Sequence, residues 1–402
     1  MDVNIDFKCT SVPLRLYSGE NALDNLPSEL HRCKAKRAFV LCGRTVSRRS
    51  DLIARIRSIL GGTCVGLFDE IEKDSTLPSV LRAAEAARAA APDVLVAVGG
   101  GSVVQAARVV LILLAESRPL EQMVTQYPEH GPAISPKLLA PKLPVINVLT
   151  LPTAAQNRGG SAIRNDALEH RMEVFDPKTR PVAIFWDRDA LLTAPLALAR
   201  AAACTVYWRI VMNLGWKSIN PLLEGTRLHA FRLASRAIVQ LDSADPAART
   251  ELCAAALLLN RDADEGGLGG EKHWPARVSY ALATALLLCY PNARQGEALT
   301  AVTGTVLRQW GAGDSAAMVQ LAQNLGLWTP TTPDAAAPGM VADYLDGVFT
   351  RLAMPTRLRE LGIPADGLSR IVERSLKNFN ADPRQEFAHK RDVLVDTLNR
   401  CW

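Results

Sequence analysis

A short apolar run at 93–98 (DVLVAV) constrains the fold of this chain more than any other segment. It ends in three glycines, and a helix-like stretch follows over 102–116. A strand with one solvent-exposed face alternates apolar and polar residues. A continuous apolar run is typical of a parallel strand whose two faces are both buried. The segment therefore predicts the interior of a parallel sheet with helices on both sides.

Strand-like and helix-like segments alternate around this run. The sequence predicts further strands at 37–42, 63–68, 144–150 and 182–186, and helices at 51–60 and 77–91. This β-α alternation is typical of a doubly wound parallel sheet.

The composition changes near residue 191, where alanine- and leucine-rich helical patterns replace the strand signals. The clearest predicted helices lie at 195–213, 221–241, 247–260 and 278–288. We therefore expect an α/β domain over 1–190 and an all-helical domain over 191–402, with the active-site cleft between them.

Charge and composition limit the partners. The 402 residues carry a net charge of +5 without a long basic run, which argues against nucleic acid and fits a small anionic substrate better. The first six residues include two aspartates where a signal peptide would be basic and apolar, and the most apolar run, 109–115, is too short to span a bilayer. We expect a cytoplasmic protein with no membrane partner. The eight cysteines fit no zinc motif.

The glycine turn Gly99-Gly100-Gly101-Ser102 lies between the buried strand and the helix that follows. Glycines let a backbone approach a pyrophosphate closely, and a helix N-terminus offers free N–H groups and the positive end of its dipole. A tight turn without any ligand is the alternative. The context favours phosphate binding.

Several short motifs, in the same order along the chain, resemble the iron-dependent alcohol dehydrogenase superfamily. GGGSVVQAAR resembles the family's GGGS-x-x-D-x-A-K, with Gln105 in place of the aspartate and Arg108 in place of the lysine. Pro152-Thr153-Ala154 resembles its P-T-T segment. Later matches are Asp187 at a strand end, Thr193-Ala194-Pro195, Pro221-Leu222 and Asp382-Pro383-Arg384. The stretch CGRTVSRRSDL looks closest to the maleylacetate reductase branch.

This resemblance implies an α/β dinucleotide-binding domain joined to a helical domain, a fold that dehydroquinate synthase is also similar to. It implies a nicotinamide cofactor, and we expect a homodimer. The expected cofactor contacts are Gly43, Arg44, Gly99, Gly100, Gly101, Ser102, Gln105, Arg108 and Thr153. We expect NADP rather than NAD, because the first strand ends in Cys42-Gly43-Arg44 without an acid for the ribose, and Arg44, Arg48 and Arg49 could meet the extra phosphate.

The resemblance also identifies positions where the family holds its metal. The family's aspartate and histidine, four residues apart on one helix, correspond to Thr205 and Arg209. Its H-x-x-x-H stretch resembles 280–284, which places Tyr280 and Thr284 at the histidines, and Gln295 stands at the last ligand. A guanidinium stays protonated and repels a cation, so we expect no metal.

Without a metal, other side chains must act on the substrate. Arg209 could hold a carboxylate or offset developing negative charge, and Tyr207, Tyr280 or Lys217 could serve as catalytic groups. Core packing is the alternative for the tyrosines, and an exposed position for Lys217. The remaining expected substrate contacts are Thr205, Thr284, Gln295 and His273.

No acid lies three or four residues from Arg209 on its helix, so an intrahelical ion pair is ruled out, although a partner such as Glu297 stays open. The first functional hypothesis is a metal-independent NAD(P)-dependent oxidoreductase acting on a small anionic carbonyl or enoate. The alternative is a non-redox homologue, either a lyase, cyclase or isomerase or an inactive partner subunit. Gln105 supports this alternative, because the family's aspartate lies in the cofactor cleft.

Overall fold

The computed structural model describes residues 5–216, 220–241, 245–262, 264–265 and 272–402. Six parallel strands form one sheet in the order β1-β8-β5-β4-β2-β3. The strands are β1 Arg15–Gly19, β2 Ala38–Cys42, β3 Cys64–Phe68, β4 Val94–Gly99, β5 Val145–Leu149 and β8 Ala183–Asp187. The helices that accompany them are α1 Leu26–Arg32, α2 Arg44–Arg49, α3 Leu52–Leu60, α4 Leu77–Ala90 and α5 Gly101–Ala115.

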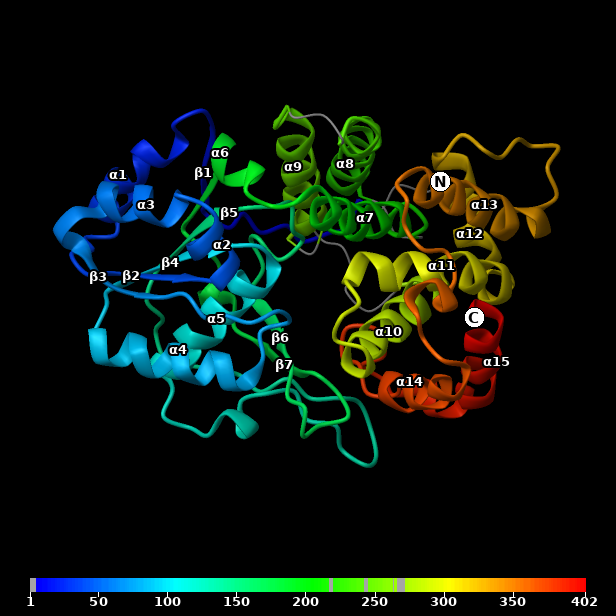
Figure 1. Ribbon diagram of the computed structural model, residues 1–402. Helices are drawn as coiled ribbons and strands as arrows, with labels where there is room; N and C mark the ends of the chain where they lie inside the picture. The colour runs from blue at the N-terminus through cyan, green and yellow to red at the C-terminus, as the bar shows by residue number, and fades with distance from the viewer. Residues whose placement is uncertain (1–4, 217–219, 242–244, 263, 266–271) are drawn as a thin grey trace.

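Strand β4 lies in the interior of this sheet and is buried throughout. Val94, Val96 and Val98 pack into the core that α1 and α3 cover, whereas Leu95 and Ala97 pack into the core beneath α4 and α5. Figure 1 shows the two helical layers on opposite sides of the sheet. The prediction of a doubly wound sheet is therefore confirmed.

Three short strands gave no signal in the sequence. Strand β1 lies at the edge of the sheet and pairs with β8 alone among the described strands. Most of its residues are exposed, as is usual for edge strands. Strands β6 Gly160–Ile163 and β7 Met172–Phe175 form a separate antiparallel pair. Each has four residues, which is too short for alternation to identify.

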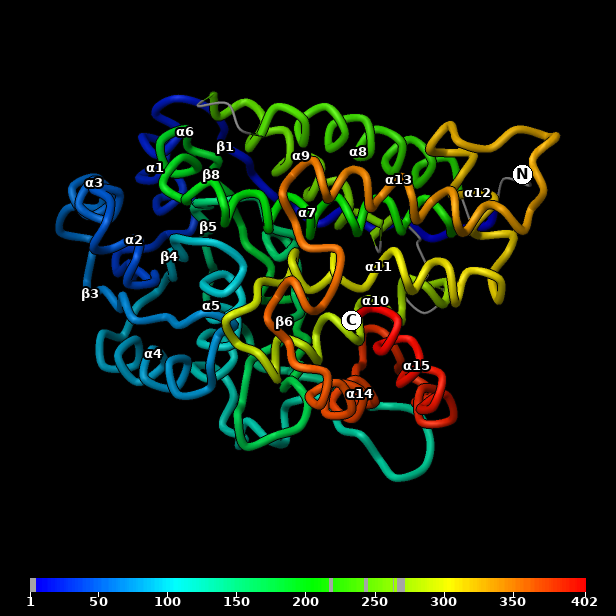
Figure 2. The backbone as a smooth tube through the Cα atoms, turned by 45° about the vertical axis from the view of Figure 1, so that its right-hand side comes forward, coloured from blue at the N-terminus to red at the C-terminus, as the bar shows by residue number. Residues whose placement is uncertain are grey.

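Helices make up the second half of the described chain (Figure 2). They are α6 Arg188–Leu192, α7 Leu196–Asn213, α8 Pro221–Val239, α9 Ala247–Arg261, α10 Trp274–Cys289, α11 Gln295–Trp310, α12 Ser315–Asn324, α13 Ala337–Arg351, α14 Leu368–Ser375 and α15 Arg391–Cys401. Short 3-10 turns connect several of them. The fold class is thus the predicted one. In the part of the chain that the structure describes, no helix is long and apolar enough to cross a membrane.

Helices α7 and α11 cross at very close range in the helical core. A Cβ atom added to Gly296, in the first turn of α11, would lie 1.9 Å from the carbonyl oxygen of Ala201 on α7. Because the obstacle is backbone, one of the two helices would have to move. Gly225 on α8, by contrast, has nothing within 4 Å of an added Cβ.

We expect Gly296→Ala to lower the free energy of unfolding by about 2 kcal/mol or more, since overpacking a rigid contact forces backbone shifts. The matched control Gly225→Ala should raise it by up to about 1 kcal/mol, because alanine is the better helix former. Urea denaturation of both variants measures this. Equal stabilities would show that α7 and α11 do not cross this closely.

Candidate active site in the cleft

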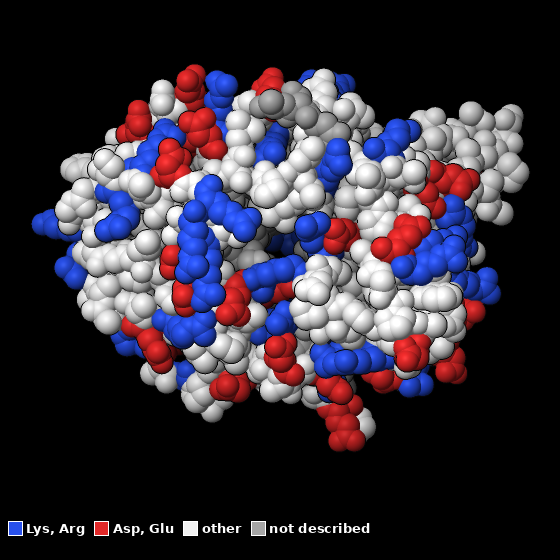
Figure 3. Space-filling model, viewed as in Figure 1, with Lys and Arg blue, Asp and Glu red and all other residues white. Residues whose placement is uncertain are grey.

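A cavity of about 1420 Å³ opens at the carboxyl ends of the parallel strands, between the sheet and the helices. Figure 3 shows the hollow and the Lys and Arg side chains along it. Small-ligand pockets commonly measure about 300–1,000 Å³, so this volume has room for a dinucleotide beside a small substrate. The strand order changes direction between β2 and β4, because β3 follows β2 on one side and β4 lies on the other. Ligands of open α/β sheets bind at such a switch point.

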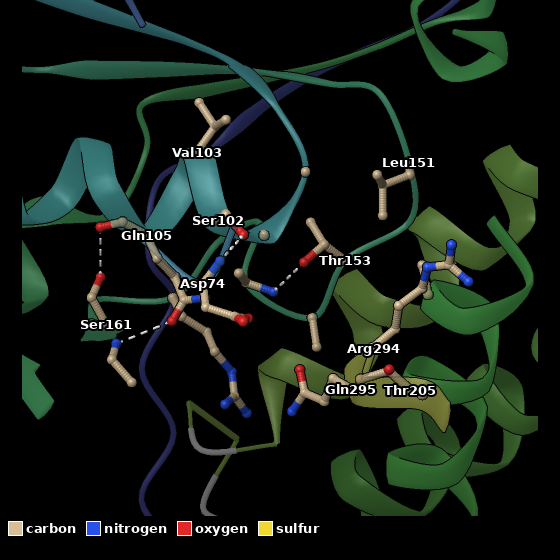
Figure 4. Close-up of a pocket in the computed structure, with 18 of the residues that line it drawn as sticks. Asp74, Ser102, Val103, Gln105, Leu151, Thr153, Ser161, Thr205, Arg294 and Gln295 are labelled. Atoms are coloured by element: carbon tan, nitrogen blue, oxygen red, sulfur yellow. Dashed lines mark hydrogen bonds between the residues drawn. The ribbon is translucent and has the colours of Figure 1, made fainter. Parts of the chain in front are cut away.

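The glycine turn after β4 leaves little space for side chains. An added Cβ would lie 2.6 Å from Cγ2 of Val103 at Gly99, and 2.7 Å from Cδ2 of Leu151 at Gly100. At Gly101, where α5 begins, it would lie 3.1 Å from Oγ1 of Thr153. The turn therefore brings bare backbone and the N-terminus of α5 to the cavity wall (Figure 4). This arrangement fits an anionic phosphate group.

Ser102 connects this turn to the segment before α4. Its Oγ accepts a hydrogen bond from the backbone N–H of Asp74 at 3.0 Å, and its carbonyl accepts one from the hydroxyl of Ser75 at 2.7 Å. These bonds hold the start of α5 in place. The hydroxyl proton of Ser102 is still available to a ligand in the cavity.

Gln105 lines the cavity one turn further along α5. Its Oε1 accepts a hydrogen bond from the backbone N–H of Ala162 at 3.0 Å, and the hydroxyl of Ser161 donates to its carbonyl at 3.0 Å. Gln105 therefore connects α5 with β6. A carboxylate oxygen of an aspartate at this position could accept the same hydrogen bond from Ala162. Thr153, also a lining residue, accepts a hydrogen bond from the N–H of Ala155 at 3.1 Å.

Arg108 does not reach the cavity, contrary to the expectation that the resemblance gave. It is fully buried and donates hydrogen bonds to the backbone carbonyls of Gly160 and Ala155. Burial, with a smaller effect of Arg180, lowers the pKa of Arg108 to about 9. The residue stabilises the connection after β5 and is not a cofactor contact.

The far end of the cavity, beside β2, is lined by both basic and acidic side chains. Gly43, Arg44 and Arg49 line it, whereas Arg48 does not. Arg44 pairs with Glu70 at 2.8 Å, and Glu70 also lines the cavity. This acid follows β3, so the end of the first strand alone gave no sign of it. An acid is therefore available near the expected ribose, beside the two arginines.

Helical elements supply the opposite wall. Thr205 and Arg209 on α7, Tyr280 on α10 and Gln295 on α11 all line the cavity. The hydroxyl of Thr205 donates to the carbonyl of Ala201 at 3.0 Å. Thr205 and Gln295 lie across the pocket from Ser102 (Figure 4). Residues from three helices, α7, α10 and α11, are thus brought together on one wall.

These four side chains do not fit the iron or zinc that the superfamily's fold implies. They offer a hydroxyl, a guanidinium, a phenol and an amide, whereas such ions are held by imidazole, carboxylate or thiolate. Within the described ranges, no group of three or more His, Cys, Asp or Glu side chains could hold a metal ion.

Three other expected site residues lie outside the cavity lining. Tyr207 is a core residue whose hydroxyl is 2.8 Å from that of Tyr344. The hydroxyl of Thr284 donates to the carbonyl of Tyr280 at 2.7 Å. His273 caps α10 and its Nε2 donates to the carbonyl of Met212 at 3.0 Å. All three serve the packing of the helices. Lys217 lies outside the described residues.

Arg209 has no hydrogen-bonded partner in the described part of the chain. Burial lowers its pKa, and Tyr280 and Asp262 oppose that effect. Asp262 is itself held by Arg227 at 2.6 Å. Glu297, which the sequence left open as an ion-pair partner of Arg209, pairs with Arg294 at 2.7 Å instead.

Several further cations line the cavity and gave no signal in the sequence, and two of them, Arg158 and Lys272, interact electrostatically with Arg209. Arg158 follows β5, and its Nε donates to Oδ1 of Asn260 at 2.7 Å. Lys272 precedes α10, and its Nζ donates to the carbonyl of Asn380 at 3.2 Å. Their only sequence cue is position: Arg158 follows the P-T segment, and Lys272 adjoins a glycine-rich stretch.

Comparisons with known proteins agree with this architecture. Residues 13–188 match the family model of iron-containing alcohol dehydrogenase. The bifunctional aldehyde-alcohol dehydrogenase AdhE of Escherichia coli is 24% identical over 98% of this chain and 45% of its own length. The chain therefore spans about half the length of that relative. Maleylacetate reductase 2 of Cupriavidus pinatubonensis is 42% identical over 24% of this chain and 26% of its own.

A solved structure shows the same fold over the whole chain. An archaeal halo-thermophilic Red Sea brine pool alcohol dehydrogenase has a TM-score of 0.84 and 17% sequence identity, with 100% of both chains covered. Together these findings show that residues 13–188 are similar to iron-containing alcohol dehydrogenases and that the whole chain has the fold of a solved alcohol dehydrogenase. The replacement of the metal ligands stays a prediction.

Two buried arginines allow a matched stability test. Arg108→Met removes the donor to two partly buried carbonyls and should lower the free energy of unfolding by about 2 kcal/mol or more. Arg209→Met removes a cation that has no hydrogen-bonded partner among the described residues, so stability should stay constant or rise. Thermal unfolding of the two variants checks this. A large loss of stability in Arg209→Met would make Arg209 a structural residue and remove it from the site.

Proposed function

We propose that this protein is a metal-independent, NAD(P)-dependent oxidoreductase that reduces a small anionic carbonyl or enoate compound. One observation carries the proposal. The glycine turn at the N-terminus of α5 and Arg209, which has no hydrogen-bonded partner among the residues that the structure describes, line one cavity from opposite walls. The first suits a pyrophosphate and the second suits a substrate carboxylate.

When bound, the nicotinamide cofactor supplies the hydride. Gly100 and Gly101 would place the pyrophosphate at the N–H groups of α5, with Ser102 as a further donor. Arg209, with Arg158 beside it on the cavity wall, would hold the anionic group and orient the carbonyl. The same cations stabilise the negative charge that develops on the carbonyl oxygen, which is the role a metal plays in a Lewis-acid mechanism.

The metal-free part of this proposal has a direct test. Elemental analysis of the purified protein should find no stoichiometric iron or zinc, because Thr205, Arg209, Tyr280 and Gln295 form a poor donor set. Stoichiometric metal that disappears in a Thr205→Ala, Gln295→Ala variant would contradict the proposal.

The cofactor preference depends on the far end of the cavity. We expect NADPH to bind more tightly than NADH, and Arg49→Ala to weaken NADPH binding about tenfold through loss of one charge-assisted contact. NADH binding should change little. Fluorescence titration measures both, and Arg57→Ala, an exposed arginine on α3 outside the cavity lining, is the matched control.

Glu70→Gln sharpens this test. It releases Arg44 from its ion pair and removes a negative charge, so it should increase the preference for NADPH. Tighter binding of NADH in the wild type would overturn the preference. If neither cofactor binds, the proposed oxidoreductase activity is overturned and the non-redox alternative is favoured.

A further inference from the structure

Lys272 occupies an unusual position on the cavity wall. It lies two residues before the start of α10, and its Nζ is 3.2 Å from the carbonyl oxygen of Asn380. That bond uses one of the three ammonium protons, so two remain for the cavity. No carboxylate is paired with its Nζ among the described residues.

The charged groups around Lys272 act against its ammonium form. Arg209 on α7 and Arg158 after β5 repel the ammonium, while Asp262 and Glu173 attract it. Both acids are engaged elsewhere: Asp262 with Arg227 at 2.6 Å, and Glu173 with Tyr127 at 2.9 Å.

Burial is the largest influence, followed by the two arginines. Together they lower the pKa of Lys272 to about 7, from an ordinary value of about 10.4. An amine of this kind is half protonated near neutral pH, which suits general acid–base catalysis.

We propose that Lys272 is a catalytic residue that donates a proton to the substrate oxygen, while Arg158 and Arg209 hold the substrate's anionic group. This inference rests on the proposed function and assigns its missing proton donor. The two arginines then act twice, since they bind the anion and also make Lys272 a better acid.

The proton transfer balances as follows. The carbonyl carbon accepts the hydride that the cofactor supplies, and the π pair of the C=O bond moves to the oxygen. That oxygen takes a proton from Nζ of Lys272, so an N–H bond breaks and an O–H bond forms. The neutral amine recovers a proton from water. One carbonyl, one NAD(P)H and one proton thus give one alcohol and one NAD(P)⁺.

The protonation of Lys272 can be measured without any turnover. The protein is labelled with trinitrobenzenesulfonate between pH 6 and pH 10, and the extent of labelling at Lys272 is read by peptide mass spectrometry. We expect half-maximal reactivity near pH 7, because only the neutral amine reacts. Arg209→Met should move this midpoint to higher pH, since it removes a repelling cation. A midpoint near pH 10 in both proteins would overturn the proposal.

Kinetics test the role itself. NADPH oxidation is followed with pyruvate, oxaloacetate and 2-oxoglutarate as probes. Lys272→Met and Lys272→Arg should both lower kcat by about 10²–10⁴-fold, since neither side chain can pass a proton near neutral pH. The kcat of the wild type should fall as pH rises through about 7, because the donor must be protonated. Lys36→Met, an exposed lysine outside the cavity lining, should leave kcat unchanged.

The outcomes separate the two proposals. Turnover by the wild type with an unchanged kcat in both Lys272 variants would overturn the role of Lys272 and leave the proposed function intact. If the wild type reduces none of the probes and binds no dinucleotide, the proposed function is overturned. The role of Lys272 as proton donor is then overturned with it. Unaltered melting temperatures of the Lys272 variants establish that the loss of activity is chemical.

Discussion

Positive charge concentrated on the wall of the cavity is the constraint on which this cleft depends. Arg158, Arg209 and Lys272 share one cavity, and burial lowers the pKa of all three. Repulsion by neighbouring arginines lowers the pKa values of Arg158 and Lys272 further. The carboxylate nearest in electrostatic effect, Asp262, is already paired with Arg227. Holding like charges together costs free energy, so an anionic ligand is the natural way to offset it. The same charges oppose a divalent cation and favour a neutral lysine.

The scaffold that holds these charges is ordinary for its class. The sheet is buried on both faces, and α7 and α11 cross at close range, so neither wall of the cavity can shift easily. A solved alcohol dehydrogenase with 17% identity shares this scaffold over its whole length. A fold of this kind does not fix the chemistry, which depends on the few side chains that line the cleft.

The sequence predicted the parts of the molecule that periodicity controls. The apolar run of β4 and the glycines after it could only form a buried strand and a turn, and both are present. It left Tyr207 open between a catalytic role and core packing, and the structure places it in the core. Helix α7 is apolar around most of its circumference, so its pattern does not show which side faces the cleft. Arg158 and Lys272 lie in connections, whose path depends on contacts between distant segments such as Lys272 with Asn380. No local pattern contains that information.

The most direct test of the whole account is a crystal structure of the protein with NADPH and 2-oxoglutarate. The account predicts the pyrophosphate at the N-terminus of α5, a carboxylate between Arg158 and Arg209, and the keto oxygen within hydrogen-bond distance of Nζ of Lys272. A metal ion bound at Gln295 and Thr205, or a dinucleotide bound away from Gly99–Ser102, would contradict it.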